Sequence, residues 1–368
     1  MTVQRKKLHQ LFFPLFFETL FMMLAGMVDT LMLSSEGDYA VGAVGTANTY
    51  ISLFIIMFSI ISSGMVAVMT QYIGAKRPGV AHQALTLGLV FNLSVGVVIT
   101  GVLVFGTDAI LNAVGIAQAL EASANIYLRT IGVFCICNAL IPILSSYLRS
   151  FGHTTPTMVA TVAANIINVV LNGLFLFVMH WGVFGVALAT GISRLVNLLW
   201  LWIAARCRIK PEKDAAPPAN QEVLRKIIRV GLPAATETIL YNIAITLVIS
   251  MLNRMDASGA QVTARSYALQ ISNFSYCVSA ALAHANAVLV GWYIGGCEIE
   301  ACKRDTRRAA VLGIGASIAV SGLFVIFSKP IVGLFTDNPD MIRLVGTSRY
   351  SDAWQSRSLR GPEQQLLS

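Results

Sequence analysis

The sequence has little charge and none of the short motifs that identify common enzymes. Asp, Glu, Lys and Arg together make up 12% of its 368 residues, against about 25% in a typical soluble domain. It contains no GxxxxGK[ST] phosphate loop, no HExxH and no GxSxG. Its six cysteines form no CxxC pairs and lie within or beside apolar segments, as buried thiols do. These absences argue against an enzyme and against an ATP-driven pump with its own nucleotide-binding domain.

Long apolar segments take the place of charge, since hydrophobic residues make up 56% of the chain. A spanning helix needs about 20 mostly apolar residues. We therefore predict an all-α polytopic membrane protein of the plasma or inner membrane. Nine spans are expected near residues 11–34, 45–73, 83–106, 124–148, 157–180, 184–205, 228–252, 264–294 and 307–328.

Positive charge collects in alternate loops between these spans. The positive-inside rule assigns such loops to the cytoplasm, so the N-terminus is expected there. The net charge of +8 thus indicates orientation in a bilayer, and we expect no binding of nucleic acid. The basic runs lie at residues 5–7, 76–77, 149, 206–226 and 303–308, whereas the opposite loops carry Glu36, Asp38, Asp108 and Glu121.

The chain also repeats itself. Pro14 is followed four residues later by Glu18, and the same arrangement recurs as Pro233 with Glu237. A Tyr-Ile-Gly sequence at residues 72–74 recurs at residues 293–295, so both landmarks return after nearly the same interval. Two matched landmarks in the same order indicate homologous halves, which are typical of secondary transporters whose substrate path lies between the halves. Transport driven by an ion gradient is therefore the leading hypothesis.

The repeat predicts the domain organisation. Residues 1–206 form an N-lobe of six spans, residues 207–227 a proline-rich cytoplasmic linker, and residues 228–345 a partial C-lobe of three spans. A second full copy would extend to about residue 452, so we expect the chain to be truncated at its C-terminus. The polar residues 346–368 fit an interruption of the sequence better than a natural soluble tail.

Polar side chains inside the spans are candidate functional groups, because burying an ionisable group in lipid costs several kcal/mol. Asp29 lies within the first span, although a structural role near the outer interface is an alternative. The fifth span carries a polar face that either joins helices by hydrogen bonds or offers oxygen atoms to a cation. With Thr190 of the sixth span, these groups form an oxygen-rich set suited to Na⁺ or to a proton. The face consists of Thr161, Asn165, Asn168 and Asn172.

The second half carries its own polar candidates. Glu237 is followed by Asn242 on the seventh span, and the eighth span is unusually polar. Such a span could line a cavity for a flat or cationic substrate. Glu18 lies nearer a helix start, where the helix dipole stabilises a carboxylate, so a structural role has more weight there. The cavity-lining candidates are Glu18, Asn165, Asn242, Gln270, Asn273 and Tyr276.

Four of these segments together resemble the multidrug and toxic compound extrusion (MATE) transporters, over about residues 10–345. They are residues 14–30 with Val28-Asp29-Thr30, the loop at 149–154, the asparagine face, and residues 182–190. The resemblance implies two six-helix lobes around a central cavity and export of organic, often cationic drugs in exchange for Na⁺ or H⁺.

The resemblance also assigns roles to individual residues. Asp29, Asn168, Asn172 and Thr190 correspond to a cation-coupling site in the N-lobe, where Na⁺ could bind. Glu237 corresponds to a coupling or substrate carboxylate of the C-lobe. Asn172 stands where some members have Asp, which lowers the negative charge of the site. The carboxylate that the family carries on its tenth helix has no counterpart here.

Two other functions stay open. A flippase for lipids or lipid-linked oligosaccharides, from the same superfamily, should line its cavity with cations that hold pyrophosphate, and Arg129 and Arg194 are the residues to examine. An inactive truncated fragment is the other alternative. We expect a monomer that contacts a small organic substrate and membrane lipid, is not an enzyme, and has no cofactor besides its coupling ion, Na⁺ or H⁺.

Overall fold

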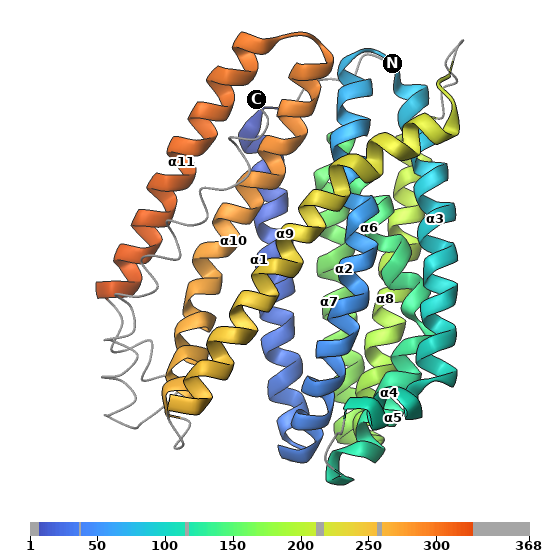
Figure 1. Ribbon diagram of the computed structural model, residues 1–368, viewed down its shortest axis with the longest axis vertical. Coiled ribbons are helices and arrows are strands. Elements are labelled where there is room, and N and C mark those ends of the chain that lie inside the picture. The colour runs from blue at the N-terminus through green and yellow to red at the C-terminus, as the bar shows by residue number, and fades with distance from the viewer. Residues whose placement is uncertain (1–6, 37, 115–117, 211–216, 256–259, 327–368) are drawn as a thin grey trace. The chain divides into compact units, whose positions relative to one another are not determined.

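The computed structural model describes residues 7–36, 38–114, 118–210, 217–255 and 260–326 (Figure 1). Nearly all of these residues are helical, and no strand occurs among them, as the sequence predicts. The predicted tail at 346–368 lies outside the described residues. The helices are α1 (Leu8–Ser34), α2 (Asp38–Gly74), α3 (Pro78–Phe105), α4 (Thr107–Val114), α5 (Gln118–Val133), α6 (Cys135–Ser150), α7 (Thr154–Gly173), a π-helical turn (Leu174–Val178), α8 (Gly182–Arg208), α9 (Asn220–Met255), α10 (Ala260–Gly295) and α11 (Ile299–Ile326).

Each predicted span coincides with helical residues, but the fourth is not one straight helix. α5 and α6 meet at Phe134 with a bend of 48°. Among the described residues, six helices are long and apolar enough to cross a membrane, or seven if the bent pair is one span. α9 and α11 are not in this set.

The helices form two compact units. The first comprises residues 1–239 and 281–309, and the second comprises residues 240–280 and 310–368. In the second unit, the Ser279 hydroxyl of α10 hydrogen-bonds the Ser317 hydroxyl of α11 at 3.0 Å. The division into lobes at residues 206 and 228 stays a prediction. The site described below lies wholly in the first unit.

The Tyr-Ile-Gly repeat marks the same type of helix end in both copies. α2 ends at Gly74 and α10 at Gly295, and the second residue after each glycine has a positive φ, 61° at Lys76 and 59° at Cys297. Both ends are Schellman motifs, in which a later N–H closes back onto a carbonyl of the last turn. The equivalent closing bonds run from Arg77 N to Tyr72 O at 2.8 Å and from Glu298 N to Tyr293 O at 2.9 Å.

These two helix ends also touch each other. A Cβ atom at Gly74 would overlap the backbone of Trp292, and one at Gly295 would overlap the backbone of Gln71. Gln71 and Trp292 each stand three residues before the glycine of their own copy, so the contact is symmetric between the two copies of the repeat. Only glycine permits two helices to approach this closely. The indole of Trp292 further donates a hydrogen bond to Ser150 O of α6 at 2.9 Å.

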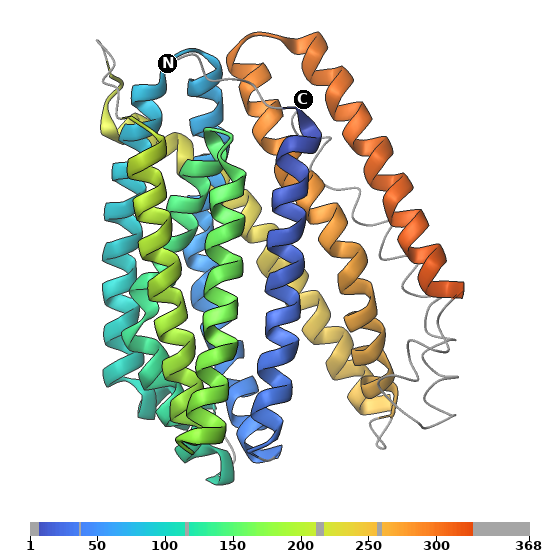
Figure 2. The same cartoon turned by 180° about the vertical axis from the view of Figure 1, so that it is seen from behind.

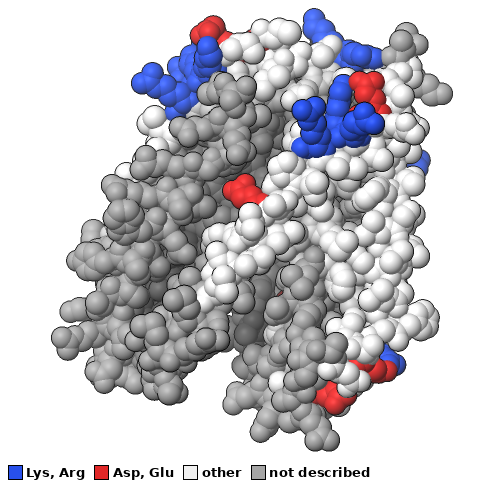
Figure 3. Space-filling model, viewed as in Figure 1, with Lys and Arg blue, Asp and Glu red and all other residues white. Residues whose placement is uncertain are grey.

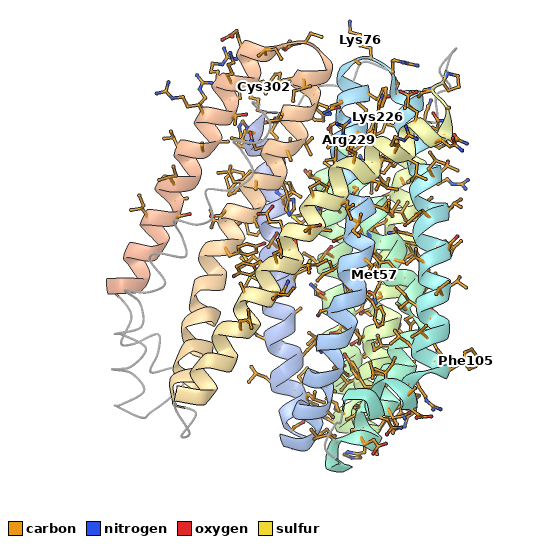
Figure 4. All side chains as sticks on the ribbon, in the orientation of Figure 1. Met57, Lys76, Phe105, Lys226, Arg229 and Cys302 are labelled. Atoms are coloured by element: carbon orange, nitrogen blue, oxygen red, sulfur yellow. The ribbon has the colours of Figure 1, made fainter. Side chains whose placement is uncertain are left out.

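The outer faces of the first unit suit a lipid environment. On α3, apolar side chains point away from the bundle, and Phe105 at its end is 86% exposed (Figure 4). Lys76, Lys226 and Arg229 all lie toward the opposite end from Phe105 (Figure 4). On the visible face, Lys and Arg gather toward the ends, while an acidic side chain lies between them (Figure 3). An apolar surface between charged ends is the pattern of a membrane-spanning bundle.

The symmetric glycine contact predicts a sharp difference between two Gly→Ala changes. Gly295→Ala forces α2 and α10 apart and should destabilise the protein by about 1–3 kcal/mol, as overpacking does. Gly101→Ala on α3 is the matched control, because nothing lies within 4 Å of its new Cβ. Thermal unfolding of the purified variants in detergent measures both. Equal unfolding midpoints for the two variants would contradict the contact.

Candidate functional site

α7 packs against both α1 and α8, and it carries the polar face predicted from the sequence (Figure 2). Asn168 and Asn172 are four residues apart and therefore project from the same side of α7. Both side chains are buried, and so is Thr161 further along that side. Asn165 is only half-buried, and its amide donates to Phe21 O at 3.3 Å. The polar face of α7 thus looks toward its neighbouring helices.

Four of the predicted site residues come together where α1, α7 and α8 meet. The Asn172 amide donates to Asp29 Oδ1 at 2.9 Å and lies 3.4 Å from Asn168 Oδ1. The Asn168 amide in turn lies 3.4 Å from Thr190 Oγ1. We call Asp29, Asn168, Asn172 and Thr190 the Asp29 cluster. One carboxylate, two amides and a hydroxyl from three helices share this cluster.

The amide of Asn168 faces the same carboxylate. One of its terminal atoms lies 2.6 Å from Asp29 Oδ1 and 3.2 Å from Oδ2. With its nitrogen at that place, the amide donates to the carboxylate.

One acceptor of the cluster has no donor within the described part of the chain. The Asn172 side chain is fully buried, and its Oδ1 atom makes no hydrogen bond. A buried polar atom without a partner costs about 1–3 kcal/mol. Binding of a cation or a proton donor at the cluster would satisfy this oxygen.

Three neighbours of the cluster did not emerge from the sequence as part of it. Tyr127 of α5 is buried and donates to Asn48 Oδ1 of α2 at 3.2 Å. Arg194 follows Thr190 by one turn on α8, and both Tyr127 and Arg194 are close enough to Asp29 to interact with it electrostatically. Tyr127 and Asn48 are single polar residues on separate spans. No spacing in the sequence links such residues, so the sequence does not predict that they lie near the cluster. From the sequence, Arg194 stands out only as a residue that would distinguish a flippase.

Glu18 lies elsewhere, in a buried ion pair. Its carboxylate is 4% exposed and accepts a hydrogen bond from Arg149 Nη2 of α6 at 2.7 Å. Two hydroxyls of α7 also donate to it, Thr157 at 3.0 Å and Thr161 at 3.3 Å. This carboxylate is saturated with donors and links α1, α6 and α7. Its surroundings fit a structural role better than the predicted lining of a cavity.

The candidates of the second half lie on α9 and α10. Glu237 and Asn242 are exposed on α9, and Tyr276 of α10 is 54% exposed. Gln270 and Asn273 also lie on α10, but their side chains fall outside the described residues. No group of three or more His, Cys, Asp or Glu residues with metal-binding geometry occurs in the described part of the chain.

Comparison with known proteins points to one family. The MatE family model matches twice, at residues 14–174 and 233–350, and the two matches begin at Pro14 and Pro233, the prolines that mark the sequence repeat. The uncharacterized transporter YisQ of Bacillus subtilis is 32% identical over 342 residues, which cover 91% of this chain and 74% of that protein. The probable multidrug resistance protein NorM of Thermotoga maritima is 26% identical over 348 residues, covering 92% and 74%.

The fold has solved counterparts as well. An outward-facing multidrug resistance MATE family transporter of the MOP superfamily aligns with a TM-score of 0.83 at 22% identity. The alignment covers 92% of this chain and 77% of that one. This likeness confirms the predicted fold class of a MATE-like helical bundle.

The Glu18 ion pair yields a prediction about stability. Glu18→Leu leaves Arg149 without its buried partner and should cost about 3–5 kcal/mol of unfolding free energy. The double variant Glu18→Leu/Arg149→Met removes both charges and should regain most of that loss. Lys303→Met, which breaks an exposed pair with Glu300, is the control and should change little. Unfolding in detergent checks all three, and a double variant as unstable as the single one would refute the pairing.

Proposed function

The chain belongs to the MATE family of efflux transporters, and from that premise we propose that it exports organic, often cationic compounds in exchange for a cation, Na⁺ or H⁺. The family membership rests on two matches of the family model over more than half of the chain. The chain is a multi-pass membrane protein. Export, the substrate class and the coupling ion are the parts that we propose.

The Asp29 cluster is the observation that supports coupling to a cation. Its carboxylate lies within the first span and is held by amides rather than by a salt bridge at contact distance, since Asn172 donates to it at 2.9 Å. A bound proton or cation would displace these donors and loosen the links among α1, α7 and α8. A ligand shifts a conformational equilibrium only through such differential contacts. The cluster therefore provides a physical route from ion binding to helix rearrangement.

Glu237 is proposed as the second carboxylate of the pathway. It is exposed on α9, unlike its repeat equivalent Glu18, which is buried and paired. An exposed carboxylate attracts a cationic compound. On α10, Tyr276 separately offers an exposed aromatic ring of the kind that binds cations. Asn165 and Asn242 are proposed as further contacts for the substrate.

The orientation follows from the charges and is also a proposal. Lys76, Lys226 and Arg229 lie toward one end of the first unit (Figure 4), whereas Asp108 follows α3 at the other end. The positive-inside rule places the basic end, and with it the N-terminus, in the cytoplasm.

The flippase alternative is less well supported. Its cavity should hold arginines that are free to bind pyrophosphate. Arg129 instead pairs with Asp108 at 2.7 Å on an exposed surface, and Arg194 lies close to Asp29. Both guanidinium groups therefore have acidic neighbours within the chain.

Efflux measurements test the proposed function. Inverted membrane vesicles containing the full chain should move a fluorescent organic cation when a Na⁺ or proton gradient is imposed. Asp29→Asn removes the negative charge of the cluster and should lower this coupled transport by roughly tenfold or more. Asp108→Asn is the matched control, because this exposed carboxylate lies outside the cluster, and it should transport normally. Lack of gradient-driven transport by the unmodified chain would exclude the proposal, and normal transport by Asp29→Asn would exclude the role of Asp29.

A further inference from the structure

We propose that Arg194 is a fixed internal cation of the Asp29 cluster and that it excludes Na⁺ from the cluster. This inference rests on the proposed function and narrows its coupling ion. It assigns to Arg194 a role in ion selectivity, and it does not require Arg194 to touch the transported compound.

The depth of Arg194 in α8 explains why it needs an acidic neighbour. α8 has 27 residues, and Arg194 follows its first residue, Gly182, by twelve positions, about 18 Å along the helix axis. That places the guanidinium near the middle of a spanning helix. An arginine at such depth is costly in lipid and faces either a cavity or an opposite charge. Asp29 is the carboxylate with which it interacts in the described structure.

The geometry of α8 directs Arg194 toward the cluster. Thr190 and Arg194 are four residues apart, so their side chains share one face of the helix. Thr190 lies on the face that meets α7, since its Oγ1 is 3.4 Å from the Asn168 amide. Arg194 is thus adjacent to the cluster on its cytoplasmic side, given the proposed orientation.

The formal charges around Asp29 sum to zero. α7 contributes only the neutral amides of Asn168 and Asn172, and α5 contributes the neutral phenol of Tyr127. Among the described residues, the charges that act on each other here are the carboxylate on α1 and the guanidinium on α8. A hard cation that gives up its water needs carboxylate oxygens and a net negative site. In this protein, the guanidinium of Arg194 already supplies the positive charge that a bound Na⁺ would otherwise bring to Asp29.

The expected size of the effect follows from Coulomb repulsion. Two unit positive charges several ångströms apart, in an environment of intermediate dielectric constant, disfavour each other enough to lower Na⁺ affinity by roughly tenfold to a hundredfold. Asn172 cannot offset this repulsion, because an amide supplies an oxygen without a charge. An aspartate at the same position would restore the negative balance.

Equilibrium binding of ²²Na⁺ to the purified full chain in detergent tests the proposal without any substrate or transport. At constant ionic strength, the unmodified chain should show no saturable binding. Arg194→Gln should gain saturable binding, with an affinity roughly tenfold or more above that of the unmodified chain, and Asp29→Asn/Arg194→Gln should lose it again. Arg194→Lys keeps the charge and should resemble the unmodified chain. Arg129→Gln removes an exposed arginine that pairs with Asp108 and should also leave binding unchanged.

A second variant keeps the test decisive if Arg194→Gln does not fold. Asn172→Asp adds a carboxylate beside Arg194 and should also create a saturable Na⁺ site. Saturable, Asp29-dependent Na⁺ binding by the unmodified chain would overturn the proposal, and so would the absence of binding in the folded charge variants. Because the measurement needs no efflux, its outcome is independent of whether the chain exports organic compounds.

Discussion

A close backbone contact in the first unit constrains both copies of the repeat, the crossing of α2 and α10 at Gly74 and Gly295. Each glycine lies against the backbone of a residue in the other copy of the repeat, Trp292 for Gly74 and Gln71 for Gly295. Any side chain at either position would separate the two helices. The contact joins the two copies within one packed unit, and Trp292 extends the link to α6 through Ser150. In both copies, the glycine of the Tyr-Ile-Gly repeat therefore stands where the structure has no room for a larger side chain.

The sequence predicted the features that follow from local pattern. Apolar length located every long helix, and the spacing of Asn168 and Asn172 placed both amides on one side of α7. The bend at Phe134 has no such signal, because the nearest proline, Pro142, lies eight residues further along α6. The partner of Glu18 was equally hidden. Arg149 is 131 residues away in sequence, and the packing of α1 and α6 against α7 brings the two charges together.

Two carboxylates on one helix show why position in a span does not by itself define function. Glu18 accepts hydrogen bonds from a guanidinium and two hydroxyls, so its charge is fully compensated and difficult to exchange. Asp29 is held at contact distance by the Asn172 amide, and Arg194 acts on it from farther away. Giving up a hydrogen bond from a neutral amide costs less than breaking a buried ion pair. Asp29 can therefore change its partners more readily than Glu18 can.

The sequence repeat does not give equivalent residues of the two halves the same surroundings. Glu18 and Glu237 occupy equivalent positions, four residues after a proline. Yet Glu18 is enclosed by side chains of α6 and α7, whereas Glu237 is exposed on α9. Duplication preserves the backbone position of a carboxylate, but its charge state and accessibility depend on helices that pack around it later in the chain. Equivalent residues of the two halves can therefore serve different purposes, because only Glu18 is enclosed as a structural anchor.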